Sequence, residues 1–191
     1  ILCMKWGTKY GPEYVNRLYG MVRRHLRGDF RFVCLTDRSQ GIRAEVECHP
    51  IPPLDLPPGI PERGWTKLTT FGADLHGLRG TALFLDLDVV IVDDITPFFE
   101  VPGEFLIIHD WKRPWRVTGN SSVYRFRLGA HADLLQYFRE HVDEVRIEVG
   151  ARRAELDALT GPAPEEVVAR GHQVEQGGEL AAIGQHVGEG G

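Results

Sequence analysis

Two aspartates, Asp86 and Asp88, stand two residues apart in the apolar stretch FLDLDVVIVDD at 84–94. In an extended segment, residues two apart point to the same face, so the two carboxylates would lie side by side, while Leu85 and Leu87 would point the other way. Like charges at this spacing resist burial among apolar residues. A divalent cation removes the difficulty, because Mg²⁺ and Mn²⁺ bind carboxylate oxygens together with phosphate oxygens and water. The sequence therefore predicts a metal site at Asp86 and Asp88.

A simpler interpretation exists for acidic residues near the end of a strand. Such residues can emerge into solvent without binding anything, and Asp93 and Asp94 fit this description. Apolar residues continue as far as Val92, however, so Asp86 and Asp88 do not lie where the apolar run ends. This distinction favours the metal interpretation for the first pair of aspartates only.

The elements that would position these aspartates alternate between strand and helix patterns. We expect an α/β fold with a Rossmann-like, mostly parallel sheet flanked by helices. The stretch 81–92 is apolar on both faces and should lie at the centre of the sheet, with ligands bound outside the carboxyl ends of the strands. Apolar runs predict strands at 1–4, 30–37, 44–51, 81–92, 103–110 and 121–126, and helical spacing predicts helices at 12–26, 65–78 and 131–142.

The composition limits the kind of partner. The chain has 191 residues, enough for one domain with its own core. A net charge of −5 argues against nucleic-acid binding, and no stretch approaches the ~18 apolar residues of a transmembrane segment. Cys3, Cys34 and Cys48 lie in or beside apolar runs without metal-type spacing, so we expect reduced, buried cysteines. These features predict a cytoplasmic protein, and a peripheral association with a membrane is compatible with them.

The last part of the chain differs in composition from the rest. The four Trp, five Tyr and nine Phe residues all lie at or before Phe138. Because aromatic side chains supply much of the area that a core buries, we expect a folded domain over 1–141 and an atypical, loosely ordered tail over 142–191, helical in part over 142–159. The chain begins with Ile1 rather than Met, so we also expect a fragment of a longer protein.

Five segments occur in an order that is typical of one enzyme family. They are CMKWGTKYG (3–11), CLTD (34–37), WTKL (65–68), FLDLDVVIVDD (84–94) and GNSSVYRF (119–126). This order resembles that of nucleotide-sugar glycosyltransferases of the GT-A fold, particularly the D-x-D enzymes related to glycogenin and to bacterial galactosyltransferases. The resemblance covers the part of the chain up to about residue 141 and implies a GT-A-like fold. It also implies a metal-dependent transfer of a sugar from a nucleoside-diphosphate sugar to an acceptor hydroxyl.

The resemblance also implies roles for individual residues and ligands. The cation would be Mn²⁺ or Mg²⁺, bound by Asp86 and Asp88. The donor would be a nucleoside-diphosphate sugar, with a UDP-sugar favoured, and the acceptor a saccharide or a lipid-linked molecule. The nucleotide and donor sugar would contact Lys5, Trp6, Gly7, Thr8, Asp37, Lys67 and Asp86, and the sugar or acceptor pocket would contain Asp110, Asn120 and Ser121.

The chain departs from the family pattern after residue 126. Retaining members of the family have an Asp-Gln pair and a C-terminal histidine that completes the metal shell, but this chain has no Asp-Gln dipeptide. Its late histidines, His172 and His186, lie in the aromatic-free tail and are expected to be solvated. Two other interpretations therefore stay open. One is a catalytically silent module that binds nucleotide sugars, and the other is a haloacid-dehalogenase-type phosphatase with Asp86 as nucleophile.

Overall fold

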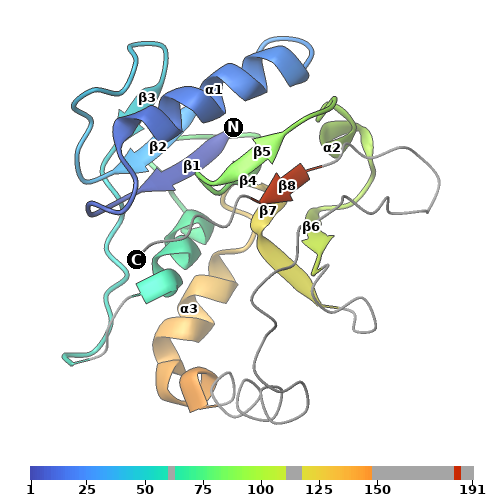
Figure 1. The fold of residues 1–191 in the computed structure, drawn as a ribbon. Coiled ribbons are helices and arrows are strands. Elements are labelled where there is room, and N and C mark those ends of the chain that lie inside the picture. Colours follow the sequence, from blue (N-terminus) through green and yellow to red (C-terminus); the bar gives the residue numbers. More distant parts are fainter. Residues whose placement is uncertain (60–62, 111–117, 148–182, 186–191) are drawn as a thin grey trace, which may run out of the picture.

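The computed structural model describes residues 1–59, 63–110, 118–147 and 183–185. Its main feature is a six-stranded sheet with the strand order β3-β2-β1-β4-β7-β6 (Figure 1). A second, two-stranded sheet joins β5 and β8. The strands are β1 (Leu2–Lys5), β2 (Val33–Thr36), β3 (Glu47–His49), β4 (Thr81–Leu85), β5 (Val89–Ile91), β6 (Phe105–His109), β7 (Gly119–Arg127) and β8 (Ile183–Gln185), and the helices are α1 (Pro12–His25), η1 (Arg63–Phe71), α2 (Pro97–Glu100) and α3 (Ala132–Glu140).

The sheet is mostly parallel, as the sequence predicted. β1 pairs in parallel with both β2 and β4, and β2 pairs in parallel with β3. β7 runs antiparallel between β4 and β6. β4, the first part of the stretch predicted to be central, lies inside the sheet with β1 on one side and β7 on the other. The predicted α/β fold with a flanked, mostly parallel sheet is therefore confirmed.

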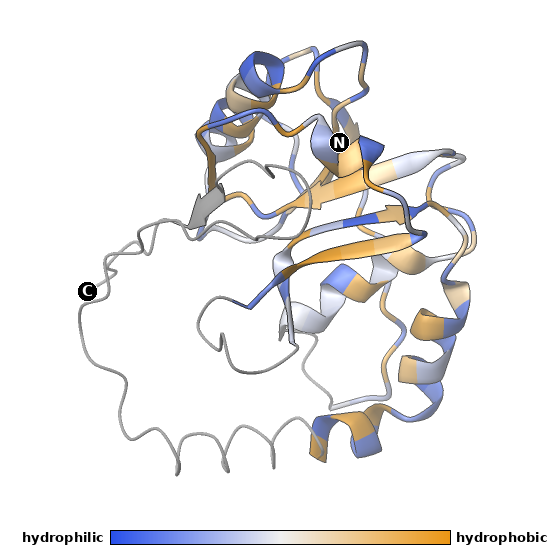
Figure 2. Cartoon of the chain, turned by 90° about the vertical axis from the view of Figure 1, so that its right-hand side faces the viewer, coloured by the Kyte–Doolittle hydropathy of each residue, from blue (hydrophilic) through white to orange (hydrophobic). Residues whose placement is uncertain are grey.

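Helices cover both faces of the sheet because the strands alternate apolar side chains between two cores. Residues at odd positions in β1 and β4, such as Cys3 and Leu83, pack with the apolar side of α1. Residues at even positions, such as Met4 and Phe84, pack with η1 and α3 on the other face. Figure 1 shows α1 on one side of the sheet and η1 with α3 on the other, and Figure 2 shows the hydrophobic strands between them.

The three cysteines form a row across neighbouring strands. Cys3 on β1 is in register with Cys34 on β2, which is in register with Cys48 on β3. All three belong to the core beneath α1 or pack against it. Cys3 and Cys34 are buried, Cys48 is half-buried, and each is a free thiol, so the prediction of reduced cysteines holds and that of burial holds fully for the first two.

The prediction of one continuous strand over 81–92 was wrong. β4 ends at Leu85, a turn follows in which the Val89 amide donates to the Asp86 carbonyl at 3.3 Å, and β5 begins at Val89 in the second sheet. Continuing the strand would carry two carboxylates through the sheet, whereas the turn leaves Asp86 and Asp88 half-exposed and buries Leu87 beneath α1. The prediction that Leu85 and Leu87 point away from the aspartates holds in part, because both leucines lie in the same core.

Other predicted elements differ from the observed ones in length and type. The segment predicted as a helix over 65–78 is a 3-10 helix that ends at Phe71. Its threonine hydroxyls bond to carbonyls three residues earlier, from Thr69 to Thr66 and from Thr70 to Lys67, which suits the tighter 3-10 turn. The strand predicted over 44–51 shortens to β3. The helices predicted at 12–26 and 131–142 correspond to α1 and α3.

Only parts of the predicted loose tail can be compared with the structure. Residues 142–147 are helical, in agreement with the partial helix predicted there. β8 pairs antiparallel with β5, with Val89 opposite Gln185, and the prediction of a loose tail did not include this strand. The rest of the tail lies outside the described residues, and the division at residue 141 stays a prediction.

Candidate functional site

The ends of five strands bring the predicted site residues to one edge of the sheet. The parallel strands β1, β2 and β4 end there at Lys5, Thr36 and Leu85. β7 begins at the same edge, because its residue Val123 lies opposite Leu85 and its earlier residues extend beyond the end of β4. β6 is antiparallel to β7 and also ends there, at His109. This is the edge at which α/β sheets bind their ligands.

Asp86 is held from the η1 face of the sheet. The Lys67 ammonium lies 2.7 Å from both carboxylate oxygens, and it also approaches the Ser121 carbonyl at 3.4 Å. The Asp86 amide donates to the Ser122 carbonyl at 2.9 Å, which fixes the start of the turn against β7. Burial raises the pKa of the Asp86 carboxyl, and the charge of Lys67 opposes this effect. Asp86 is therefore paired with a cation from the protein itself.

Asp88 is held from the opposite face, by a neutral group. The Tyr10 hydroxyl donates to Asp88 Oδ2 at 2.9 Å from the turn that precedes α1. Partial burial raises the pKa of the Tyr10 hydroxyl, so this group stays a protonated donor at neutral pH. Within the described part of the chain, Asp88 Oδ1 has no hydrogen-bond partner and the carboxylate forms no ion pair, although Tyr10 and, to a smaller extent, the charge of Asp88 raise the pKa of the exposed Lys9 ammonium. Asp86 and Asp88 lie close enough that the charge of Asp88 also raises the pKa of Asp86.

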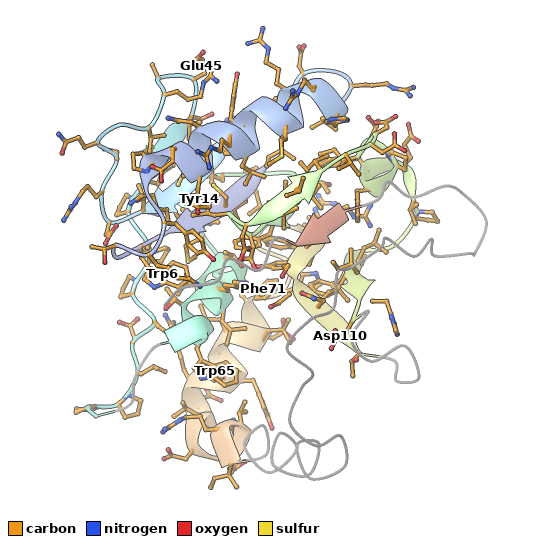
Figure 3. The ribbon with its side chains drawn as sticks, in the orientation of Figure 1. Trp6, Tyr14, Glu45, Trp65, Phe71 and Asp110 are labelled. Carbon is orange, nitrogen blue, oxygen red and sulfur yellow. The ribbon has the colours of Figure 1, made fainter. Side chains whose placement is uncertain are left out.

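The turn after β1 is tied to the end of β2. The Gly7 amide donates to Asp37 Oδ2 at 2.9 Å, and Gly7 has a φ of +63°, which favours glycine. Lys5 is buried, yet its ammonium has no hydrogen bond or ion pair with any residue that the structure describes. Trp6 and Thr8 are exposed, and Figure 3 shows Trp6 beside the end of β1. These residues form no hydrogen bond or ion pair with Asp86.

The residues predicted for the sugar or acceptor pocket lie at the start of β7 and just after the end of β6. Asn120 Oδ1 accepts a hydrogen bond from the Ser122 amide at 2.9 Å, so Asn120 stabilises the start of β7. Ser121 is exposed and its carbonyl faces Lys67. The Asp110 amide bonds to the Thr118 carbonyl at the end of β6, two strands away from β4, and Figure 3 shows Asp110 far from Trp6. Asn120 and Ser121 thus lie near Asp86, and Asp110 lies further along the edge.

Sequence reasoning missed two residues that contact the aspartates. Tyr10 is part of the segment CMKWGTKYG, but only its residues 5–8 were assigned to the site. An aromatic residue in a polar turn just before a helix was the available signal. Ser122, adjacent to the predicted Ser121, hydrogen-bonds to Asp86 through its side chain, which lowers the pKa of that carboxyl.

Comparison with solved structures identifies the fold. The galactosyltransferase LgtC, solved in complex with donor and acceptor sugar analogues, is similar to this chain with a TM-score of 0.51 and 14% sequence identity. The chain has a glycosyltransferase fold. The match covers 70% of this chain and 60% of LgtC, so the chain spans about three fifths of that enzyme.

Other comparisons add little to this glycosyltransferase fold. The apo-form glycosyltransferase GlyE of Streptococcus pneumoniae gives a TM-score of 0.45 at 14% identity, over 86% of this chain and 40% of GlyE. No model of a protein family matches the chain, and no curated protein matches its sequence. Within the described ranges, no helix has both the length and the apolar character needed to cross a membrane.

The donor set at the strand edge fits a cation at Asp88 better than at Asp86. Asp88 keeps one carboxylate oxygen without a partner among the described residues, whereas both oxygens of Asp86 face Lys67. Hard cations prefer such carboxylate oxygens and complete their shell with water or phosphate. The residues that the structure describes contain no cluster of three or more metal-ligating side chains, and His172 and His186 lie outside them. A cation here would take most of its ligands from bound substrate and water.

Proposed function

We propose that this chain binds a nucleoside-diphosphate sugar, with a UDP-sugar favoured, and transfers the sugar to an acceptor hydroxyl. The support is a glycosyltransferase fold in which the edge formed by the strand ends holds two groups of opposite charge that form no ion pair with any described residue. One is the buried Lys5 ammonium and the other is the Asp88 carboxylate. A buried charge without a partner is costly, so Lys5 points to an anionic ligand, while the half-exposed Asp88 keeps one carboxylate oxygen for a cation. A diphosphate with its bound Mn²⁺ or Mg²⁺ supplies an anion for Lys5 and a cation for Asp88.

The chemistry follows from these charges. The bond between the anomeric carbon and the diphosphate oxygen breaks and its electron pair leaves with the diphosphate, while the acceptor oxygen bonds to that carbon and releases its proton to solvent. Negative charge builds up on the leaving diphosphate, where a bound divalent cation supplies electrostatic stabilisation. Lys5 stabilises the same charge, and Lys67 holds Asp86 in place to accept hydrogen bonds from the ribose or donor sugar. Asn120 and Ser121 border the sugar and the acceptor, with Asp110 further along the edge.

The remaining residues of the turn would contact the nucleotide. Trp6 and Thr8 are exposed beside the end of β1, and Asp37 holds the turn through the Gly7 amide. An exposed aromatic side chain offers a face on which a nucleotide base can stack. We assign the base and ribose to this part of the edge.

Ligand-dependent stability tests the proposal. The melting temperature of the full chain is measured with UDP, UDP-glucose or UDP-galactose, each with and without Mn²⁺. At a ligand concentration of about 100 Kd, binding to the folded state adds about 2.7 kcal/mol, which raises the melting temperature by about 5–10 °C. We expect this rise only with Mn²⁺ present, and we expect Asp88→Asn to abolish it.

A matched variant separates the site from a general charge effect. Asp93 is exposed five residues further on, and its carboxylate accepts the neighbouring Asp94 amide. Asp93→Asn should keep the full Mn²⁺-dependent rise. If no UDP compound stabilises the wild type, or if both variants behave alike, the proposal is wrong.

The release of UDP separates transfer from silent binding. Mn²⁺-dependent release of UDP from a UDP-sugar supports the transferase, and binding without release supports the silent module. The phosphatase alternative gains no support from the geometry, because Asp86 would be its nucleophile and both oxygens of that carboxylate face Lys67 at 2.7 Å.

A further inference from the structure

We propose that Tyr10 is a positioning residue for Asp88, which orients the carboxylate toward the bound cation. This inference rests on the proposed function and assigns a role to a residue outside the predicted site. Tyr10 would not touch the substrate or the cation. It would act through the carboxylate that does.

The contact joins two segments that are distant in the sequence. Tyr10 lies in the turn between β1 and α1, and Asp88 lies in the turn between β4 and β5, 78 residues further on. The phenol donates to Oδ2 at 2.9 Å, so the carboxylate has one oxygen fixed and the other, Oδ1, available. A carboxylate fixed in this way presents one oxygen in a defined direction, as ligating groups supported by a hydrogen bond generally do.

The surroundings of Tyr10 hold its ring in place. The Tyr14 ring on α1 meets it edge to face, with a centroid separation of 4.8 Å, and the Lys9 ammonium lies 4.9 Å from its ring centroid. Figure 3 shows Tyr14 on the side of α1 that faces the sheet. The hydroxyl is thus carried by a ring that has little freedom to turn away.

The chemical nature of the donor also matters. Lys67 forms an ion pair with Asp86, whereas the donor to Asp88 is the neutral Tyr10 phenol, and the exposed Lys9 ammonium beside Tyr10 forms no ion pair with Asp88. A neutral donor therefore orients a metal ligand without competing with the cation. The two neighbouring aspartates therefore have different partners. Asp86 is paired with Lys67 within the protein, and Asp88 is the one that would bind the cation.

Two single-atom deletions test the role of the hydroxyl. Tyr10→Phe keeps the ring and removes the contact with Asp88. Tyr14→Phe removes the same atom from the adjacent ring, whose hydroxyl has no hydrogen-bond partner among the described residues. Mn²⁺ is titrated into each full-length variant with UDP present, and free Mn²⁺ is read from its electron paramagnetic resonance signal. Melting temperatures are recorded in parallel without Mn²⁺.

We expect Tyr10→Phe to weaken Mn²⁺ binding about 10-fold, as loss of a hydrogen bond to a ligating group typically does, with little change in melting temperature. Tyr14→Phe should bind Mn²⁺ like the wild type. If Tyr10→Phe binds Mn²⁺ normally while Asp88→Asn does not, the inference about Tyr10 is wrong and the proposed function stands. If the wild type binds no Mn²⁺, both are wrong. A Tyr10→Phe chain that fails to fold would give the hydroxyl a structural role and would also overturn the inference.

Discussion

Replacing Lys67 by Met should destabilise the fold measurably even when no ligand is present. The change removes the cation that lies 2.7 Å from both oxygens of Asp86 and keeps most of the apolar length of the side chain. The Asp86 carboxylate is then left partly buried without a cationic partner. The hydrogen bond from the Asp86 amide to the Ser122 carbonyl and the one from the Ser122 side chain to the Asp86 carboxylate do not involve Lys67, so the backbone turn is retained.

The size of the effect follows from the exposure of the pair. The side chains of Lys67 and Asp86 are 20% and 21% exposed. Exposed ion pairs contribute under about 1 kcal/mol, whereas breaking a fully buried pair costs about 3–5 kcal/mol. A pair that is about one-fifth exposed should lie between these limits, at about 1–3 kcal/mol. This corresponds to a fall in melting temperature of about 2–12 °C for a chain of this size.

Urea unfolding of four chains measures the interaction directly. They are the wild type, Lys67→Met, Asp86→Asn and the double variant, and the cycle isolates the energy of the pair. Asp86→Asn alone should also cost about 1–3 kcal/mol, because it leaves the Lys67 ammonium, which is 20% exposed, without its anionic partner. Arg79→Met serves as a matched control, since its 2.9 Å pair with Asp74 is about two-thirds exposed on both sides. If Lys67→Met costs no more than Arg79→Met, the argument from burial is refuted.

Three further predictions concern stability. Gly7→Ala should cost about 1–2 kcal/mol in urea unfolding, because a φ of +63° is unfavourable for a residue with a Cβ atom; an unchanged midpoint would contradict this. Tyr124→Phe should cost about 0.5–1.5 kcal/mol by the same measurement, since it removes the buried 3.1 Å contact between the Tyr124 and Thr70 hydroxyls; equal stability would argue against that hydrogen bond. The Arg43 guanidinium lowers the pKa of Glu45 to about 2, so the stabilisation lost in Glu45→Gln should be present above about pH 4.5 and disappear as the pH falls toward 2; a pH-independent difference would exclude this cause.

The sheet and its faces were predictable because they depend on local patterns. The apolar run from residue 81 predicted a strand buried on both faces, and β4 has Leu83 and Leu85 in one core and Phe84 in the other. The convergence of strand ends at one edge followed from the parallel topology alone. Lys67 was placed near the donor by family resemblance, and it lies against Asp86.

The details of the turns were not predictable, because they depend on contacts between distant segments. The alternation of aspartate with leucine suggested that the strand continues through Asp86 and Asp88. This pattern does not show whether the sheet can bury the two carboxylates at those positions. The bond from Tyr10 to Asp88 needs two separate turns in fixed conformations. Neither turn has a sequence motif from which its contact with the other turn could be predicted.

The row of cysteines across β1, β2 and β3 makes the opening of this sheet accessible to thiol labelling. A thiol reacts as the thiolate and only where a reagent can reach it, and burial raises the pKa of both Cys3 and Cys48. Cys3 and Cys34 have no exposed surface, so an alkylating reagent should modify Cys48 in the folded chain and leave the other two untouched. Cys3 and Cys34 can then react only in the small fraction of molecules in which α1 has moved off the sheet or β1 and β2 have separated, so their slow modification measures that fraction. The rate of this slow modification reports the free energy of local opening of β1 and β2, the strands that end at Lys5 and just before Asp37, and a melting temperature does not resolve this local property.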